Sequence, residues 1–137
     1  MKVLVDTCIW SDALRKSVYN KNKPVVKELR ELITEGRIQM VGPVRQELLS
    51  GIKSKEQFNQ LKFYLKRFPD LNLTSKDFEK AAEIFNLNRK KGVQGSNTDF
   101  LICALSINHG FPVFTINKDF EKFNENSPIF LHQIREF

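Results

Sequence analysis

Four acidic residues stand far apart in the chain, at positions where strands end or helices begin: Asp6, Glu47, Asp99 and Asp119. Carboxylate oxygens are the ligands that hard divalent cations such as Mg²⁺ and Mn²⁺ prefer. Several carboxylates gathered without a cation would repel one another and raise each other's pKa. If the fold brings these residues together, the chain is therefore expected to be a metal-dependent enzyme.

Each of these acids also has a purely structural interpretation. Asp6 directly follows the apolar run Val3-Leu4-Val5 and could be a turn residue, as could Asp119. Asp99 stands at a helix start, where the helix dipole favours a negative charge. Glu47 could be a solvated helix residue that pairs with a neighbouring cation. The four are weak signals individually, so the elements that position them decide between the two interpretations.

Hydrophobic periodicity, capping residues and turn residues predict strands that alternate with helices. Strands are expected at residues 2–5, 37–41, 71–73, 112–115 and 128–131. Helices are expected at 9–14, between Pro24 and Gly36, between Pro43 and Gly51, over 55–67, from the capping pair Thr74 and Asp77 to the basic segment 89–92, and over 98–109. The last helix is apolar nearly all round, which predicts burial. A polar loop is expected at 19–23.

This alternation predicts an α/β fold for residues 1–137 as a single domain, a three-layer α/β/α sandwich with a mostly parallel central sheet flanked by helices. Ligands of such sheets bind beyond the carboxyl ends of the strands. Asp6 and the segment 115–119 follow strand ends, and Asp99 lies in the first turn of a helix that leads to the next strand. The topology thus brings Asp6, Asp99 and Asp119 to one edge of the sheet, and it does not place Glu47.

The composition favours a polyanionic partner and a reducing compartment. The net charge is +6 and the isoelectric point about 9.4, which suits nucleic acid. Cys8 and Cys103 lie in apolar stretches without metal-ligand spacing, so we expect buried free thiols in a cytoplasmic protein. No apolar run is long enough to span a membrane, and the N-terminus has no signal-peptide pattern.

Several motifs together resemble the PIN-domain ribonucleases, in particular the VapC-type toxins of bacterial toxin–antitoxin pairs. They are Val5-Asp6-Thr7, Glu47 with Gly51 four residues later, Asp99 before the apolar run 101–105, and the segment 115–120, which is the most specific. The resemblance covers nearly the whole chain. It implies a compact α/β fold, an acidic pocket for one or two Mg²⁺ or Mn²⁺ ions, and Asp6, Glu47 and Asp99 as the core acids.

The chain departs from the family pattern at the fourth pocket position. The family often has an acid where Asn117 stands, and the nearest acid here is Asp119, two residues later. Either Asp119 fills the fourth catalytic and metal-binding place, or Asn117 holds a bound water there. Thr7 and Thr115 offer hydroxyls beside the proposed pocket; each could bind a water, a carboxylate or a phosphate oxygen, or could be an ordinary strand-end residue. The other candidate substrate-binding residues are Asn117, Arg89, Lys90 and Lys91.

RNA reaches an acidic pocket only across a positive rim. The basic candidates are Arg15, Lys16, Arg45, Lys53, Arg89, Lys90, Lys91 and Lys118, of which 89–91 run directly into the helix of Asp99. Trp10 and Phe120 could stack on an unpaired base, although packing in the core is the favoured role for both.

The function that the resemblance implies is a metal-dependent endoribonuclease toxin that cleaves tRNA or rRNA and so inhibits translation. Its implied partners are a small VapB-type antitoxin, a second copy in a homodimer, and operator DNA reached only through the antitoxin. The antitoxin is expected in an apolar groove between 9–14, 25–33 and 48–52. Alternatives are a PIN-type RNA-processing nuclease outside toxin systems and a catalytically weak RNA-binding module. A phosphotransferase is disfavoured because it would need an acid at Cys8.

Overall fold

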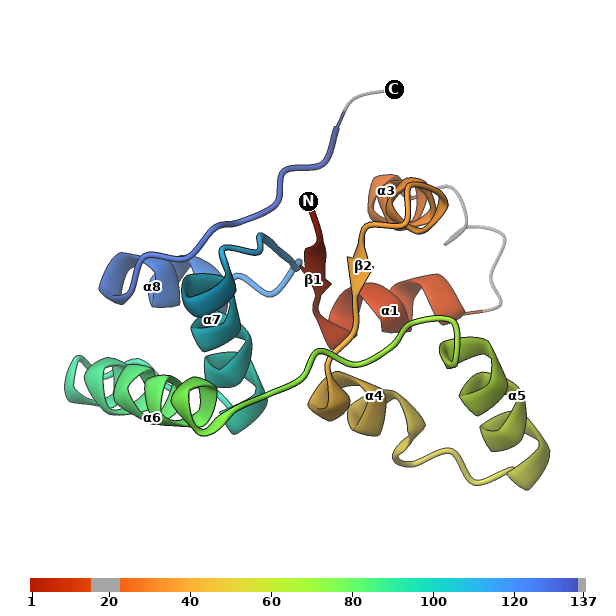
Figure 1. The fold of residues 1–137 in the computed structure, drawn as a ribbon, viewed down its shortest axis with the longest axis horizontal. Helices are drawn as coiled ribbons and strands as arrows, with labels where there is room; N and C mark the ends of the chain where they lie inside the picture. Colours follow the sequence, from red (N-terminus) through yellow and green to blue (C-terminus); the bar gives the residue numbers. More distant parts are fainter. Residues whose placement is uncertain (16–22, 136–137) are drawn as a thin grey trace.

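The structure, a computed structural model, describes residues 1–15 and 23–135. Its strands are β1 (Val3–Val5), β2 (Ile38–Gln39) and β3 (Val113–Phe114). Its helices are α1 (Thr7–Leu14), α3 (Pro24–Thr34), α4 (Gly42–Leu49), α5 (Lys55–Leu65), α6 (Ser75–Lys90), α7 (Asn97–His109) and α8 (Asp119–Asn126) (Figure 1). The polar loop expected at 19–23 lies, apart from Lys23, outside the described residues.

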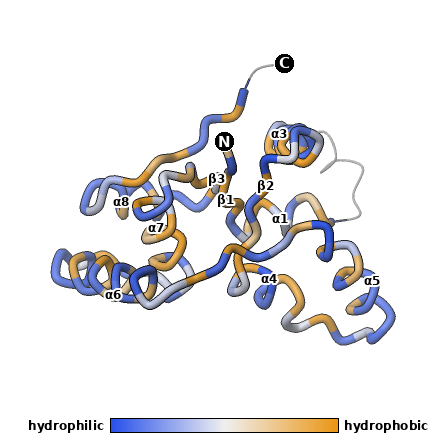
Figure 2. The backbone as a smooth tube through the Cα atoms, in the orientation of Figure 1, coloured by the Kyte–Doolittle hydropathy of each residue, from blue (hydrophilic) through white to orange (hydrophobic). Residues whose placement is uncertain are grey.

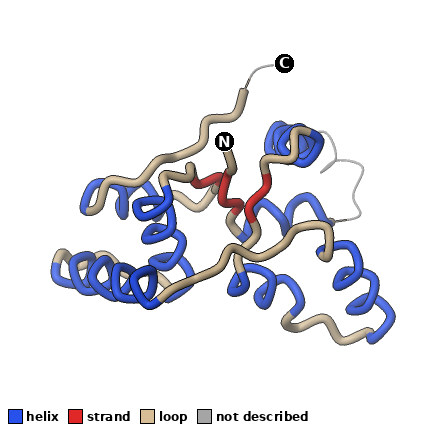
Figure 3. Tube along the Cα trace, viewed as in Figure 1, coloured by secondary structure: helices blue, strands red, loops and turns tan. Residues whose placement is uncertain are grey.

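The three strands form a parallel sheet with β1 in the centre, in the order β2-β1-β3. Leu4 pairs with Gln39 on one side and with Val113 on the other. All three residues of β1 are buried, as a strand covered on both faces requires. In Figure 3 the strands lie at the middle of the molecule, with α7 and α8 on one side and α1 and α3 on the other. The predicted α/β architecture with a parallel sheet is confirmed.

The strands expected at 71–73 and 128–131 do not form. Next to the first segment, Asp70 forms an isolated parallel bridge with Met40, and in the second segment Leu131 forms one with Val113. Both segments run along an outer edge of the sheet; the first begins two residues after Pro69 and the second begins with Pro128, and proline has no N–H to donate. They therefore cover the sheet edges with single bridges, where the sequence suggested complete strands.

Helix α7 forms the centre of the core together with β1. Its residues from Phe100 to Ser106 are all buried, so the predicted burial of this helix is confirmed. Phe100, Phe120 and Phe123 stack edge to face or at a tilt, with ring centroids about 5 Å apart. Figure 2 shows the hydrophobic stretches turned inward between the helices. No helix among the described residues has the length and apolar character needed to cross a membrane.

The two aromatic residues considered for base stacking belong to this core. Trp10 is 1% exposed and Phe120 is fully buried. The Trp10 ring meets Phe68 edge to face at 5.1 Å. Neither ring can therefore reach an RNA base, and their packing role is the one that the structure supports.

A buried carboxylate ties the C-terminal segment to α3. Glu28, with no exposed surface, accepts hydrogen bonds from His132 Nε2 at 2.5 Å and from Arg135 Nε at 3.2 Å. Arg135 also forms two bonds to Glu35, at 2.8 and 3.0 Å. Burial raises the pKa of Glu28, but the hydrogen bonds from His132 and Arg135 outweigh burial and hold this pKa below its ordinary value. The segment that follows Pro128 is thus held in place by charge as well as by its bridge to β3.

We expect Glu28→Gln to lower the free energy of unfolding by about 2 kcal/mol, because the partly exposed Arg135 loses its buried counter-charge and His132 loses a charged hydrogen-bond partner. The pKa of Glu28 is lowered, so its stabilising contribution is complete above the ordinary value of 4.5 and is lost as the pH falls through the lowered pKa. The difference between wild type and variant should therefore shrink in acid. Urea denaturation at neutral and acidic pH measures it. Glu31→Gln, an exposed position on the same helix, should change stability little, and an equal loss there would contradict the interpretation.

Candidate active site

Asp6 is fixed at the junction of two strands and a helix. It follows β1 directly, is 6% exposed and caps the N-terminus of α1. Its Oδ1 accepts the Thr7 N–H at 2.9 Å, and its Oδ2 accepts the Thr115 hydroxyl at 2.7 Å. Thr115 follows β3, the strand paired with β1. The carboxyl ends of β1 and β3 therefore meet at this carboxylate, as the parallel topology predicted.

Glu47 is joined to Asp6 through Thr7. The Thr7 hydroxyl donates to Glu47 Oε1 at 2.6 Å, while the Thr7 backbone N–H binds Asp6. Glu47 lies on α4, which begins soon after β2 at the same edge of the sheet. The predicted topology alone did not place Glu47. In the structure, α4 follows β2, a parallel neighbour of β1, and so brings Glu47 to the same edge of the sheet as Asp6.

Asp99 lies in the first turn of α7 and forms a capping box with Ser96. Its Oδ2 accepts the Ser96 N–H at 3.1 Å, and its own N–H donates to Ser96 Oγ at 3.0 Å. Burial raises the pKa of Asp99, and the negative charges of Asp6 and Glu47 raise it further. The structural role as a cap is thus real, and it coexists with electrostatic proximity to the other two acids.

Gly95 fixes how the capping segment approaches the core. A Cβ at this position would stand 2.7 Å from Phe123 Cζ and 2.9 Å from Phe100 Cζ, both in buried rings. Only glycine lets the backbone pass this close without moving the aromatic cluster. The start of α7, and with it Asp99, is therefore positioned directly against the core.

The fourth pocket position is built differently from the first three. Asn117 Oδ1 accepts the Asp119 N–H at 3.0 Å, and the Asn117 N–H donates to Thr115 Oγ1 at 3.0 Å. Asp119 is exposed in the first turn of α8, and its carboxylate accepts no hydrogen bond from the described residues. Asn117 supports Thr115, which binds Asp6. The assignment of Asp119 or Asn117 to the fourth place stays a prediction.

A thiol that the sequence left unassigned lies beside Asp6. Cys8 Sγ stands 3.4 Å from Asp6 Oδ2 and 3.5 Å from Thr115 Oγ1. Burial raises the pKa of the Cys8 thiol, and it raises that of Cys103 to about 12, with further contributions from Asp99 and Asp6. Both thiols are free, but only Cys103 is fully buried. The proximity of Cys8 to Asp6 could have been predicted from the sequence, because Cys8 stands two residues after Asp6, in the first turn of the helix.

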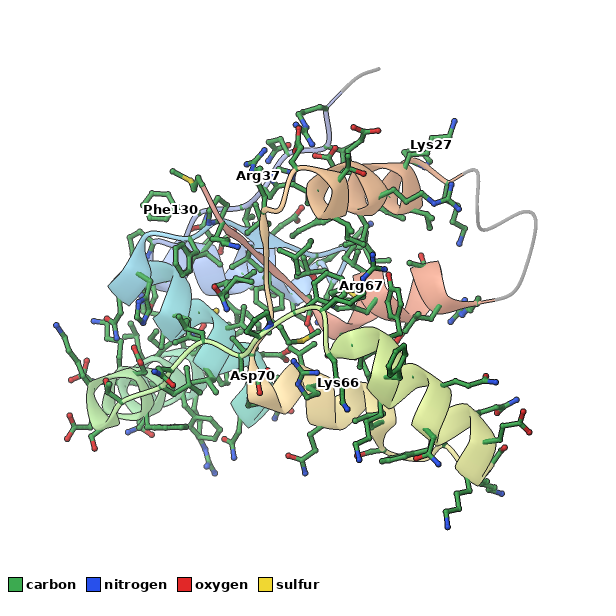
Figure 4. The ribbon with its side chains drawn as sticks, turned by 45° about the vertical axis from the view of Figure 1, so that its right-hand side comes forward. Lys27, Arg37, Lys66, Arg67, Asp70 and Phe130 are labelled. Carbon is green, nitrogen blue, oxygen red and sulfur yellow. The ribbon has the colours of Figure 1, made fainter. Side chains whose placement is uncertain are left out.

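Some of the basic candidates form ion pairs within the fold, and others are exposed. Arg45 is committed to the fold: it pairs at 3.0 Å with Asp70, whose position is labelled in Figure 4, and it donates to the Leu65 carbonyl. Arg15 lies 3.5 Å from Asp12. Arg89, Lys90 and Lys91 end α6, are exposed, and have no ion pair within the described part of the chain. Lys53 and Lys118 are exposed, and Lys16 lies outside the described residues.

The donor set suits a hard cation, although the side chains are not drawn together around one. Within residues 1–15 and 23–135, no three His, Cys, Asp or Glu side chains stand close enough to hold a metal ion as they are. Asp6, Glu47 and Asp99 nevertheless present only oxygen donors, and their mutual repulsion raises the pKa of Asp99. A bound divalent cation would relieve that repulsion.

Comparisons with known proteins identify the family of the chain. The PIN domain family matches residues 3–126, so the chain belongs to the PIN domain family. Within the family, it is 32% identical over 123 residues to Ribonuclease VapC11 of Mycobacterium tuberculosis, which covers 87% of this chain and 89% of that protein. A VapC ribonuclease of Mycobacterium bovis matches equally well.

Solved structures share the fold at lower identity. VapBC2 from Rickettsia felis, bound to a DNA fragment from its promoter, has a TM-score of 0.75 at 23% identity and covers 96% of this chain and 98% of that chain. VapBC-1 from nontypeable Haemophilus influenzae has a TM-score of 0.74 at 19% identity and covers 99% and 100%. These similarities extend over nearly the whole chain.

We expect Asp99→Asn to stabilise the protein in the absence of divalent cations, by roughly 0.5–1 kcal/mol or a few degrees in melting temperature. The raised pKa of Asp99 means that its ionised form disfavours the fold near neutral pH, and this disadvantage disappears as the pH falls below the raised pKa. Thermal denaturation with chelator, and again with Mg²⁺, measures both effects. Mg²⁺ should stabilise the wild type more than the variant.

The matched control is Glu125→Gln, an exposed acid on α8, which should change neither the melting temperature nor the Mg²⁺ response. If Asp99→Asn is destabilising in chelator, or responds to Mg²⁺ as the wild type does, the three acids do not share an electrostatic site.

Proposed function

We propose that the chain is a metal-dependent endoribonuclease and the toxin of a type II toxin–antitoxin pair. The observation that carries the proposal is the hydrogen-bonded junction in which Thr7 links Asp6 to Glu47, near Asp99, whose pKa is raised by burial and by the charges of Asp6 and Glu47. It occurs in a member of the PIN domain family that is 32% identical to a VapC ribonuclease. The proposed substrate is tRNA or rRNA in the cytoplasm, whose cleavage inhibits translation.

Asp6, Glu47 and Asp99 are the proposed ligands of one or two Mg²⁺ or Mn²⁺ ions. Such a cation supplies Lewis-acid polarisation of a phosphodiester and a lowered pKa for an attacking water. The chain's own contribution is orientation. Thr7 and Thr115 each donate a hydrogen bond to a carboxylate of the site and leave its remaining lone pairs for a cation.

Asp119 is proposed as an outer member of this group. It is exposed and held by no side-chain contact to the other three acids within the described residues, so its contribution would be to the negative field of the pocket. The side-chain oxygen of Asn117 already accepts a hydrogen bond from the Asp119 N–H, and its backbone N–H donates to Thr115. Arg89, Lys90 and Lys91 are proposed to bind phosphates of the substrate, because they are exposed and unpaired among the described residues.

The proposed antitoxin site is an apolar groove of about 430 Å³, lined by Leu14, Ile52, Leu61 and Tyr64 with two glutamines of α5. The expected segments 9–14 and 48–52 do contribute to it. The apolar stripe of α3 does not line this groove, since Val26, Leu29 and Leu32 are buried, and α5 takes its place. A VapB-type antitoxin would dock its apolar side chains there and carry the operator DNA contacts, and the toxin itself would form a homodimer.

The central test is cleavage of total RNA. Wild type should cleave with Mg²⁺ or Mn²⁺ and lose activity with chelator, while Asp99→Asn should lose more than about 100-fold, the upper range for changes around a metal site. Asp119→Asn should lose less than Asp99→Asn, because its carboxylate stands outside the hydrogen-bonded junction. Initial cleavage rates on a labelled RNA measure each effect.

Glu125→Gln is the control and should cleave as the wild type does. Full activity of Asp99→Asn, or cleavage that ignores chelator, would overturn the metal-dependent mechanism. Expression of the wild type should arrest growth and that of Asp99→Asn should not. Cleavage without growth arrest would instead place the protein among RNA-processing nucleases.

Thr115 offers a test of orientation. Thr115→Val removes the hydroxyl that donates to Asp6 and accepts from Asn117, while keeping the branched shape. We expect a loss of about tenfold in kcat, in the range found for the partners of metal ligands, and recovery in Thr115→Ser. An unchanged kcat in the valine variant would mean that Asp6 needs no hydrogen bond from Thr115.

A further inference from the structure

Most of the net positive charge of the chain stands on α5 and the loop before it. Residues 53–67 contain five cations and one acid, Glu56, which is a net charge of +4 out of +6 for the whole chain. In Figure 1, α5 lies at the edge of the molecule. The total charge suggested a polyanionic partner, and the structure concentrates that charge on one exposed helix. The five cations, all exposed, are Lys53, Lys55, Lys62, Lys66 and Arg67.

Three of these lysines share one face of α5 with an exposed aromatic ring. Positions 55, 59, 62, 63 and 66 are separated by three or four residues in succession or stand side by side, so they lie on the same side of the helix. The Phe63 ring on this side is 75% exposed, more than any other aromatic ring that the structure describes. We call this surface the α5 basic face, and it consists of Lys55, Asn59, Lys62, Phe63 and Lys66.

The lysines of the α5 basic face contribute little to the fold. Lys62 and Lys66 stand near the C-terminus of α5, which the helix dipole favours, but they are like charges four residues apart and repel each other. Lys55 is the first residue of the helix, where the dipole disfavours a cation. None of the three has an ion pair within residues 1–15 and 23–135. A bound polyanion would relieve both unfavourable interactions.

The α5 basic face is held in a fixed position relative to the acidic junction. Arg45 on α4 donates to the Leu65 carbonyl of α5 at 3.0 Å, and Glu47 stands on that same short helix. From Lys55 to Lys66 the face is about 16 Å long, at about 1.5 Å per helical residue. It is therefore an extended, rigidly placed surface on which a long substrate can be held while another part of it lies at the acids.

The chemistry of the face suits single-stranded RNA. Its lysines match phosphates, and a flat exposed ring among cations is a stacking surface for one base. An open hollow of about 590 Å³ along the face is lined by Phe63 together with the amides of Asn59 and Gln60, which suit the edge of a base. A protein interface has an apolar centre built from several side chains, whereas Phe63 is the one large apolar side chain exposed on α5.

We propose that the α5 basic face binds a single-stranded segment of the RNA substrate outside the cleaved position, with its three lysines on phosphates and Phe63 stacked on a base. This inference rests on the proposed ribonuclease function and adds a second contact surface for the same substrate. The face is distinct from the proposed antitoxin groove, which Leu61 and Tyr64 line from another side of α5. Gln60 borders both surfaces.

The test measures binding of a short, labelled, single-stranded oligoribonucleotide to Asp99→Asn protein, so that the RNA is not cleaved. Fluorescence anisotropy over a series of KCl concentrations gives the affinity and its salt dependence. The variant carries three changes that should weaken binding and reduce the slope of log K against log[salt] by about 2, at about 0.7 for each phosphate contact of a single strand. These changes are Lys55→Gln, Lys62→Gln and Lys66→Gln.

The matched control removes the same charge from exposed lysines on three other helices, α3, α6 and α8, and should leave the slope unchanged. Both triple variants should keep the melting temperature, because glutamine is as good a helix former as lysine. Phe63→Ala should weaken binding about tenfold, the size expected for one base–aromatic stack, without changing the salt slope, and Phe63→Tyr should restore the affinity. The control changes are Lys27→Gln, Lys76→Gln and Lys122→Gln.

With Asp99 intact, the α5 triple variant should raise KM for a long RNA more than it lowers kcat. Unchanged affinity and salt slope in that variant, together with a wild type that cleaves RNA, would overturn the inference while the ribonuclease function stands. If poly-L-glutamate binds the wild type as tightly as the RNA does, and Phe63→Ala changes neither affinity, the face takes an acidic peptide and the inference is wrong. Lysine-dependent RNA binding by a wild type that cleaves no RNA would keep the face as an RNA-binding surface and sink the ribonuclease function.

Discussion

The pairing of β1 on both of its edges is the constraint on which the rest of the molecule depends. Three residues, Val3 to Val5, are buried between two parallel neighbours and two layers of helices. Because all three strands run in the same direction, their carboxyl ends meet on one side, and whatever follows them is brought together. Asp6 follows β1, Thr115 follows β3, and α4 with Glu47 follows β2. A sheet with one antiparallel strand would have sent one of these groups to the opposite end.

The gathering of like charges has a cost that the surrounding structure only partly offsets. Asp6 accepts hydrogen bonds from the Thr7 N–H, the Thr115 hydroxyl and the Cys8 thiol, and Glu47 accepts one from the Thr7 hydroxyl. Asp99 has its capping box, yet its pKa is raised by burial and by the other two acids. The three carboxylates therefore remain near one another although their charges repel.

The fold was largely predictable from local signals, and the site only in part. The apolar stretch 98–109 predicted a buried helix with Asp99 in its first turn, and the position of Asp6 after three apolar residues predicted the strand end. Glu47 depended on resemblance, because no periodicity says toward which neighbour a short helix turns. The segments 71–73 and 128–131 were apolar enough to be predicted as strands, but Pro69 and Pro128 and the edge positions of both segments left only isolated bridges, at Asp70 and at Leu131.

The hydrogen bonds between Glu28 on α3 and the C-terminal segment can form only late in the synthesis of the chain. Glu28 is made early, whereas His132 and Arg135 are made more than a hundred residues later. Until they leave the ribosome, this carboxylate lacks the hydrogen bonds from both residues and stays hydrated. The central strand likewise waits for residues 113 and 114 before its second edge is covered. The acidic junction therefore assembles only after translation of nearly the whole chain, so a ribosome engaged in making this protein carries a nascent chain whose carboxylates are not yet gathered.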